Sequence, residues 1–241
     1  MIKKTEKGVE TLEERYYTKY AAAAIRGNLI RTGREDLLDE RLLTAPLDEL
    51  SATELEAIIS LAQKNGIKTY YFKKSDRRLP RVNKVLGFLK GIYFENILDV
   101  GSGRGVFLLP FLEEFPSIRV QSLDILEKRY QLLSDISRGG VSRLSVGMKD
   151  ICAMPFPEKS FDVVTMLEVL EHIPNVEAAI TSAVKLAKEY VVITVPSKED
   201  DNPEHIHLLT KERLTDMFMR AGAKKLVFDS VPCHLFMVAK L

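Results

Sequence analysis

The spacing of apolar residues divides this chain near residue 90. In residues 11–30, Leu, Tyr, Ala and Ile alternate with charged residues in the manner of a helix. Ser51 and Glu54 have the spacing of a capping box, in which each side chain binds the other residue's backbone amide. Apolar residues follow at helical spacing as far as a stop signal at Asn65-Gly66. We therefore predict a helical N-terminal extension over residues 1–90, which would act as a lid.

After residue 90 the pattern changes to short apolar runs that alternate with helical stretches. Alternating units of this kind predict an α/β fold, a doubly wound and mostly parallel seven-stranded sheet over residues 91–241. The last two runs are joined by a short turn, which predicts an antiparallel end to the sheet. The predicted strands are Ile97–Val100, Arg119–Asp124, Arg143–Lys149, Phe161–Leu167, Tyr190–Val195, Lys225–Phe228 and His234–Ala239. The predicted helices are Val106–Phe115, Glu127–Arg138, Val176–Ala187 and Thr210–Arg220.

Composition narrows the class of protein. The 241 residues are 46% hydrophobic and 29% charged, as in a globular chain that can bury its own core. A formal net charge of +1 indicates no overall attraction to nucleic acid or to a membrane. Cys152 and Cys233 stand outside any C-x-x-C pattern, and the N-terminal apolar run of residues 20–25 is too short to span a bilayer. We expect a cytoplasmic protein without a membrane segment.

The first predicted strand leads into three glycines on alternate positions, Gly101, Gly103 and Gly105, and a helical pattern begins at Val106. Glycine allows a ligand to approach the backbone closely, and the N-terminus of the following helix directs its free N–H groups at that ligand. Such a turn at the end of a parallel strand is typical of a nucleotide pocket. The spacing is G-x-G-x-G, whereas dinucleotide sites have G-x-G-x-x-G, and this disfavours a nicotinamide oxidoreductase.

Three aspartates stand at the ends of the first three predicted strands: Asp99, Asp124 and Asp150. A single Asp at such a place is most often a helix cap or a loop residue. Three of them on successive strands of a parallel sheet indicate a shared ligand site, because ligands of open α/β sheets bind at that edge.

Asp99 with the glycine turn resembles motif I of the class I S-adenosylmethionine (SAM) methyltransferases, and the resemblance extends over residues 92–241. It implies a Rossmann-like core and S-adenosyl-L-methionine as cofactor. It also implies that the glycines lie under the methionine part and that Asp99 organises contacts to the amino end. The remaining implied contacts are Asp124 with the ribose hydroxyls, Ile125 and Ile151 with the adenine ring, Asp150 with its amine, and Glu168 beside the cofactor.

Polar residues after the fourth and fifth predicted strands are candidates for the acceptor side. Glu168, Glu171 and His172 would share one face if the chain were helical there, and His205 and His207 follow the fifth strand. One reading makes one of the three histidines a general base. A second reading has both glutamates and His172, with a later histidine, bind a divalent metal. In a third reading Glu168 borders the cofactor and His172 packs or caps; we assign no metal site.

The metal reading is similar to the E-x-x-E-H plus later histidine of RNA 3′-end 2′-O-methyltransferases, which use a metal to hold ribose hydroxyls. This chain departs from that pattern, because Leu208-Leu209-Thr210 stands where those enzymes have an aromatic-acidic segment. A metal-assisted RNA ribose methyltransferase is therefore the alternative function.

The segment Lys64–Lys90 has nine basic residues and one acid, Asp76, with interleaved aromatic residues. Such a mixture can bind nucleic acid. We favour a solvated basic face with its aromatic rings in the core, and an anionic small acceptor also fits. The resemblance thus implies a SAM-dependent methyltransferase acting on an O or N atom, of a small molecule in our reading. A SAM-binding module without catalysis is a further alternative.

Overall fold

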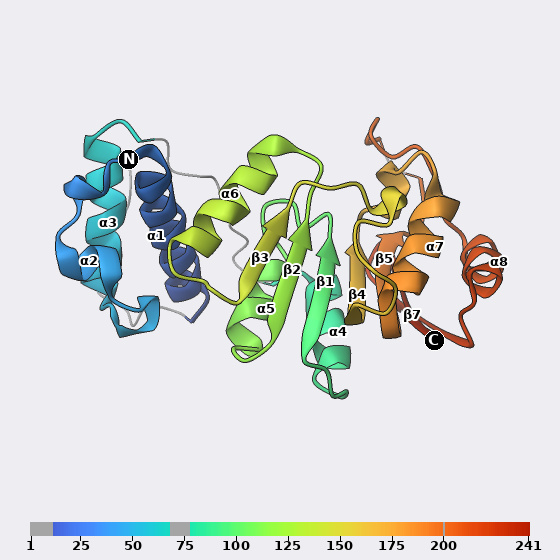
Figure 1. The fold of residues 1–241 in the computed structure, drawn as a ribbon. Helices are drawn as coiled ribbons and strands as arrows, with labels where there is room; N and C mark the ends of the chain where they lie inside the picture. The colour runs from blue at the N-terminus through green and yellow to red at the C-terminus, as the bar shows by residue number, and fades with distance from the viewer. Residues whose placement is uncertain (1–11, 68–77, 200) are drawn as a thin grey trace. The chain divides into compact units, whose positions relative to one another are not determined.

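The computed structural model describes residues 12–67, 78–199 and 201–241 of the chain (Figure 1). Its contacts form two units. Among the described residues, the helical unit contains residues 12–67 and 134–141, and the sheet unit contains residues 78–133, 142–199 and 201–241. The division into an extension over residues 1–90 and a domain over residues 91–241 stays a prediction.

The helical unit is built around α1 and α3. The capping box predicted at the start of α3 is confirmed, because the Glu54 amide donates to Ser51 Oγ at 3.3 Å and the Ser51 amide donates to Glu54 Oε2 at 2.8 Å. The N-terminal elements are α1 (Leu12–Thr32), η1 (Glu35–Leu37), α2 (Glu40–Thr44), η2 (Leu47–Glu49) and α3 (Ala52–Lys64).

Small residues allow α1 to approach residues 134–141 closely within the helical unit. A Cβ atom on Gly27 would lie 1.8 Å from the Asp135 carbonyl oxygen, and one on Gly139 would lie 1.8 Å from the Ala23 carbonyl oxygen. Beside this contact, Arg31 donates two hydrogen bonds to the fully buried Asp135 carboxylate, at 2.9 and 3.1 Å. The paired charges offset the cost of burying that carboxylate.

The sheet unit confirms the predicted fold class. Its seven strands have the order β3-β2-β1-β4-β5-β7-β6, and every pairing is parallel except those of β7. In Figure 1, α5 lies behind the strands and α7 in front of them. The elements from α4 onward are α4 (Pro80–Leu89), β1 (Asn96–Val100), α5 (Leu108–Glu114), β2 (Arg119–Leu123), α6 (Glu127–Arg138), β3 (Leu144–Gly147), η3 (Ile151–Ala153), β4 (Phe161–Leu167), η4 (Leu170–His172), α7 (Val176–Leu186), β5 (Ala187–Pro196), α8 (Lys211–Ala221), β6 (Lys225–Val231) and β7 (His234–Lys240). The residues of α6 from 134 onward belong to the helical unit.

The strand order reverses between β1 and β4, which is where open α/β sheets bind their ligands. The register places Asp99 of β1 opposite Ser122 of β2 and Thr165 of β4. All the residues of β1 after Asn96 are buried, so polar groups near its end must be satisfied within the protein or by a ligand. None of the helices in the described ranges combines the length and the apolar composition needed to cross a bilayer.

The close approach at Gly27 can be tested with a pair of helical glycines. Gly27→Ala should lower the free energy of unfolding by on the order of 3 kcal/mol, because the new methyl group would overlap a backbone carbonyl. Gly87→Ala, in α4, meets nothing within 4 Å and should raise it by about 0.5–1 kcal/mol through helix propensity. Urea unfolding followed by circular dichroism measures both. Equal effects of the two substitutions would contradict the close packing.

Candidate functional site

The glycine turn follows β1 directly. Gly101, Gly103 and Gly105 all have positive φ, at 67°, 59° and 80°, a conformation that other residues adopt at a cost. Space is also limited at Gly101, where a Cβ atom would lie 2.5 Å from Val169 Cγ2. The residues after β4 therefore pack directly on the turn. Gly105, whose Cβ would meet Leu109 at 2.7 Å, serves packing and does not line the cavity described below.

Asp99, near the end of β1, stabilises this turn through side-chain hydrogen bonds. Its carboxylate accepts hydrogen bonds from Ser102 Oγ at 2.5 Å and from Thr165 Oγ1 at 2.7 Å. Ser122 Oγ donates to Ser102 Oγ at 2.7 Å, so side chains of β1, β2 and β4 join in one network. Burial raises the pKa of Asp99 to about 6, against the two hydrogen bonds, which lower it.

The other two strand-end acids also make local hydrogen bonds. Asp124, 4% exposed, accepts from the Gly103 amide at 3.0 Å and from the Leu126 amide at 2.9 Å. Asp150 is exposed and caps η3 by accepting from the Cys152 amide at 2.9 Å. Each acid therefore has the capping or turn role expected of a lone aspartate. All three nevertheless line one cavity.

That cavity has a volume of about 660 Å³, within the usual range for small-molecule sites. The sequence-predicted residues that line it are Asp99, Gly101, Gly103, Asp124, Ile125, Asp150, Ile151, Glu168 and His172. Sequence reasoning missed several other lining residues or gave them no role: Arg81, Ser102, Arg104, Phe107, Arg129, Lys149, Val169, Asn202 and Glu204. The residues of this list that do not follow a strand belong to no sequence motif that would have identified them.

The chain is not helical at Glu168, and this corrects the expected arrangement after β4. Glu168 has a left-handed φ of 58°, and the short helix η4 covers only Leu170–His172. Glu168 therefore does not share a face with Glu171 and His172. Its Oε2 lies 2.8 Å from His234 Nε2 and 3.9 Å from Arg81 Nε.

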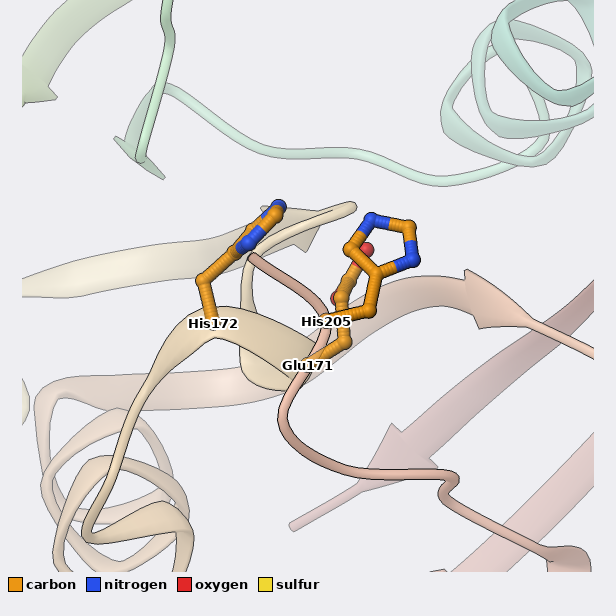
Figure 2. Close-up of side chains that lie close together, drawn as sticks. All are labelled: Glu171, His172 and His205. Atoms are coloured by element: carbon orange, nitrogen blue, oxygen red, sulfur yellow. The ribbon is translucent and has the colours of Figure 1, made fainter. Parts of the chain in front are cut away.

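Figure 2 shows the side chains of Glu171, His172 and His205 together. Their potential ligand atoms lie within 4.8 Å of one another, and the two imidazole rings meet edge to face at 4.8 Å between centroids. Glu171 is fully buried, and its carbonyl oxygen accepts from the Ile206 amide at 2.9 Å, which joins the loop after β5 to η4.

A contact with a backbone carbonyl group shows which ring nitrogen of His172 carries a hydrogen. Its Nδ1 lies 2.9 Å from the Glu204 carbonyl oxygen, which only accepts, so Nδ1 carries a hydrogen and, in the neutral ring, Nε2 carries the lone pair. The structure therefore brings His172 and His205 into contact, as a site that uses both residues would need. His207 lies outside the cluster and lines a separate cavity of about 240 Å³ with Lys198 and His205.

In the described part of the basic segment, three cations form ion pairs, whereas we had favoured a solvated basic face with its aromatic rings in the core. Arg78 and Lys90 both pair with Glu114, and Lys84 pairs with Asp229. Phe88 packs edge to face on Tyr190 and Phe236. Lys68, Tyr70, Tyr71, Phe72, Lys73, Lys74, Asp76 and Arg77 lie outside the described residues.

Comparison with known proteins identifies the family of this chain. The family model described as "Methyltransferase domain" matches residues 63–226, and the chain belongs to this family. The class I SAM-dependent methyltransferase resemblance is thereby confirmed at the level of family and fold.

Individual relatives are distant. The chain is 25% identical over 127 residues to ajmaline N-methyltransferase of Rauvolfia serpentina, covering 48% of this chain and 43% of that protein. It is 33% identical over 97 residues to ribosomal RNA small subunit methyltransferase G of Dehalococcoides mccartyi, covering 39% and 40%. It thus spans less than half the length of these curated relatives.

Solved structures share the fold. A SAM-dependent methyltransferase from Archaeoglobus fulgidus matches with a TM-score of 0.55 at 18% identity, over 67% of this chain and 91% of that one. The cyclase SpnF matches with a TM-score of 0.58 at 14% identity, over 70% and 85%. The same fold therefore carries different chemistry, and function must be argued from the site.

The burial of Asp99 predicts a specific pH dependence of stability. With a folded pKa of about 6 against an ordinary value of 3.8, the carboxyl group stabilises the fold below pH 4 and loses this contribution as the pH rises to 6. Relative to Asp99→Asn, the native chain should lose about 2 kcal/mol of unfolding free energy between pH 4 and pH 6.5. Urea unfolding of both proteins across this range checks it; a constant difference would contradict the raised pKa.

Proposed function

We propose that this protein transfers the methyl group of S-adenosyl-L-methionine to an O or N atom of a small acceptor. One observation carries the proposal: the glycine turn and three strand-end carboxylates line a single cavity at the switch point of the sheet. Family membership supports the same reaction.

The residues present fit the cofactor chemically. The methionine end of SAM carries an ammonium group, the ribose carries two hydroxyls, and the adenine carries an amine. The cavity offers acceptors for such donors in Asp99, Asp124 and Asp150, and apolar surface in Ile125 and Ile151. Ile125 is 68% exposed, as expected of an apolar side chain that a ligand covers.

The acceptor is proposed to bind where Glu168, His172, Asn202 and Glu204 line the cavity. The sulfonium already activates the methyl group, so the protein has to place the acceptor atom in line and remove its proton. His172 suits the second task, because its hydrogen is held on Nδ1 and its Nε2 lone pair is available. His205 supports the His172 ring edge to face, and His207 receives no catalytic role.

A small acceptor is favoured over nucleic acid because most described cations of the basic segment are engaged in ion pairs. Arg81 lines the cavity, with its Nε 3.9 Å from Glu168 Oε2, and is proposed to face an anionic group of the acceptor. Location in the cytoplasm stays a prediction from the sequence.

Cofactor binding is tested by calorimetry with SAM. Asp124→Asn should weaken SAM binding by roughly 10- to 100-fold, because a charge-assisted hydrogen bond is lost. Glu177→Gln, which pairs with Arg220 away from the cavity, should bind as the native chain does. NAD binding in place of SAM would overturn the proposal.

Methyl transfer is tested with labelled SAM against metabolite, RNA and protein fractions. Once a fraction accepts label, His172→Gln should lower the rate by roughly 10²- to 10⁴-fold, as expected for loss of a general base, with SAM affinity retained. SAM binding without transfer to any fraction would support the non-catalytic module instead.

The cluster of Glu171, His172 and His205 favours a second candidate, metal-assisted methyl transfer to a ribose hydroxyl of RNA. One carboxylate and two imidazoles suit a divalent ion, which would hold and acidify that hydroxyl when bound. Glu168 lies apart, with His234 and Arg81, so three of the four proposed ligands are together.

Chelation separates the two candidates. The small-acceptor proposal predicts full activity in EDTA and no binding of Mn²⁺ by calorimetry. Stoichiometric Mn²⁺ binding that is lost in His205→Asn and kept in His207→Asn, with activity that needs the ion, would establish the second candidate.

A further inference from the structure

A second cavity lies in the loop that follows β5. It has a volume of about 240 Å³ and is lined by Pro196, Lys198, Glu199 and residues 205–208. This volume is below the roughly 300–1,000 Å³ that is usual for a whole small-molecule site. The cavity therefore suits one functional group of a larger ligand.

Hydrogen bonds hold this loop in place. The Ser197 amide donates to the Cys233 carbonyl oxygen at 3.1 Å, and the Ile206 amide donates to the Glu171 carbonyl oxygen at 2.9 Å. At the far end, Thr210 caps α8 by accepting from a backbone amide of its first turn at 3.3 Å. The loop is thus anchored at its start, middle and end, which reduces the ordering cost of binding a ligand.

His207 gives this cavity a polar atom that needs a partner. Its Nε2 is buried and has no hydrogen-bond partner among the residues that the structure describes. A buried polar atom without a partner is costly, and native proteins satisfy nearly all such atoms. With its hydrogen on Nε2, His207 needs an acceptor oxygen, which a ligand in the cavity would supply.

The charged residues of the cavity indicate the kind of ligand. Lys198 and Glu199 are both exposed and carry opposite charges. An ammonium group and an imidazole N–H are both donors, so Lys198 and His207 together favour an oxygen anion. Glu199 opposes an anion, and its neutralisation should therefore strengthen anion binding.

The pair of His172 and His205 connects this cavity to the site proposed for the acceptor (Figure 2). His205 lines the second cavity, and its ring meets the His172 ring edge to face at 4.8 Å between centroids. His172 in turn lines the larger cavity. An acceptor with its reacting atom at His172 therefore has to extend only past the His205 ring to reach the second cavity.

We propose that the second cavity binds an anionic group of the acceptor, a carboxylate or a phosphate, through Lys198 and His207. The proposal rests on the proposed function for the position of the reacting atom, whereas binding of the anion itself requires neither SAM nor methyl transfer. Because Arg81 lines the larger cavity, the group bound here is separate from any group that faces Arg81. The loop after β5 would thus select acceptors by their charge.

Anion binding is tested by NMR on the ¹⁵N-labelled native chain without SAM. Sodium acetate or sodium phosphate is added at about pH 8 and constant ionic strength, and the backbone amide signals of residues 205–208 are followed. Saturable shifts with a dissociation constant of about 1–10 mM are expected for a group of this size. A response to acetate, to phosphate or to both identifies the chemistry of the group, and no saturable shift with either anion would overturn the proposal.

Substitutions at the two charged residues should act in opposite directions. Lys198→Met should weaken anion binding by roughly 3- to 10-fold, and Glu199→Gln should strengthen it by roughly 2- to 3-fold. Lys224→Met removes an exposed cation outside both cavities and should leave the affinity unchanged. Strengthening by Lys198→Met together with weakening by Glu199→Gln would show a cation site and overturn the proposal.

His207 is tested by rescue. His207→Leu should weaken anion binding by roughly 3- to 10-fold, and His207→Gln should restore it, because the Gln amide N–H can donate to the anion. Equal weakening in the two variants would contradict a hydrogen bond from His207.

Steady-state kinetics then distinguishes a group of the acceptor from a free anion. Once a fraction accepts label, the anion should inhibit methyl transfer competitively with the acceptor. Lys198→Met should raise KM for the acceptor by roughly 3- to 10-fold with kcat retained. Inhibition that is not competitive with the acceptor would indicate a free anion and overturn the proposal. Anion binding by a native chain that does not bind SAM would instead refute the proposed function itself.

Discussion

The buried hydrogen-bond network around Asp99 holds the carboxyl edge of the sheet together. Its carboxylate receives hydroxyl groups from the turn after β1 and from β4, and Ser122 of β2 completes the network through Ser102. Burying a carboxylate without such donors would cost several kcal/mol. The network therefore fixes how β1, β2 and β4 are positioned relative to one another where the glycine turn begins. The Gly103 amide then reaches Asp124, and the cavity takes its shape from these contacts.

The five residues after β4, from Glu168 to His172, direct their polar side chains toward two different parts of the sheet unit. The left-handed turn at Glu168 sends its carboxylate toward β7 and α4. The short helix that follows sends Glu171 and His172 toward the loop after β5. Backbone hydrogen bonds from the Glu168 amide to Thr194 and from the Ile206 amide to Glu171 hold both arrangements. One end of the cavity thus carries a carboxylate beside the glycine turn, and the other carries an imidazole with an available lone pair.

Ion pairing explains why a basic segment need not be a nucleic-acid surface. The described cations of α4 and its neighbours meet acids on α5 and β6, and Phe88 packs between aromatic rings of β5 and β7. The sequence shows the run of basic residues because they are adjacent along the chain. Their acidic partners are 24 to 145 residues away, so only the folded chain brings them together. Among the described cations of this segment, Arg81 lines the cavity.

Local sequence determined the elements and the residues at the glycine-turn end of the cavity. Strand and helix periodicity, the Ser51–Glu54 capping box and the glycine spacing act over a few residues, so they could be recognised without the fold. The ends of parallel strands meet at one edge, which is why Asp99, Asp124 and Asp150 could be expected to share a cavity. Tertiary structure alone decided the arrangement of the polar residues that follow β4 and β5. The backbone conformation of Glu168, its contacts with His234 and Arg81, and the choice of His205 over His207 beside His172 depend on long-range packing, which no periodicity along the chain records.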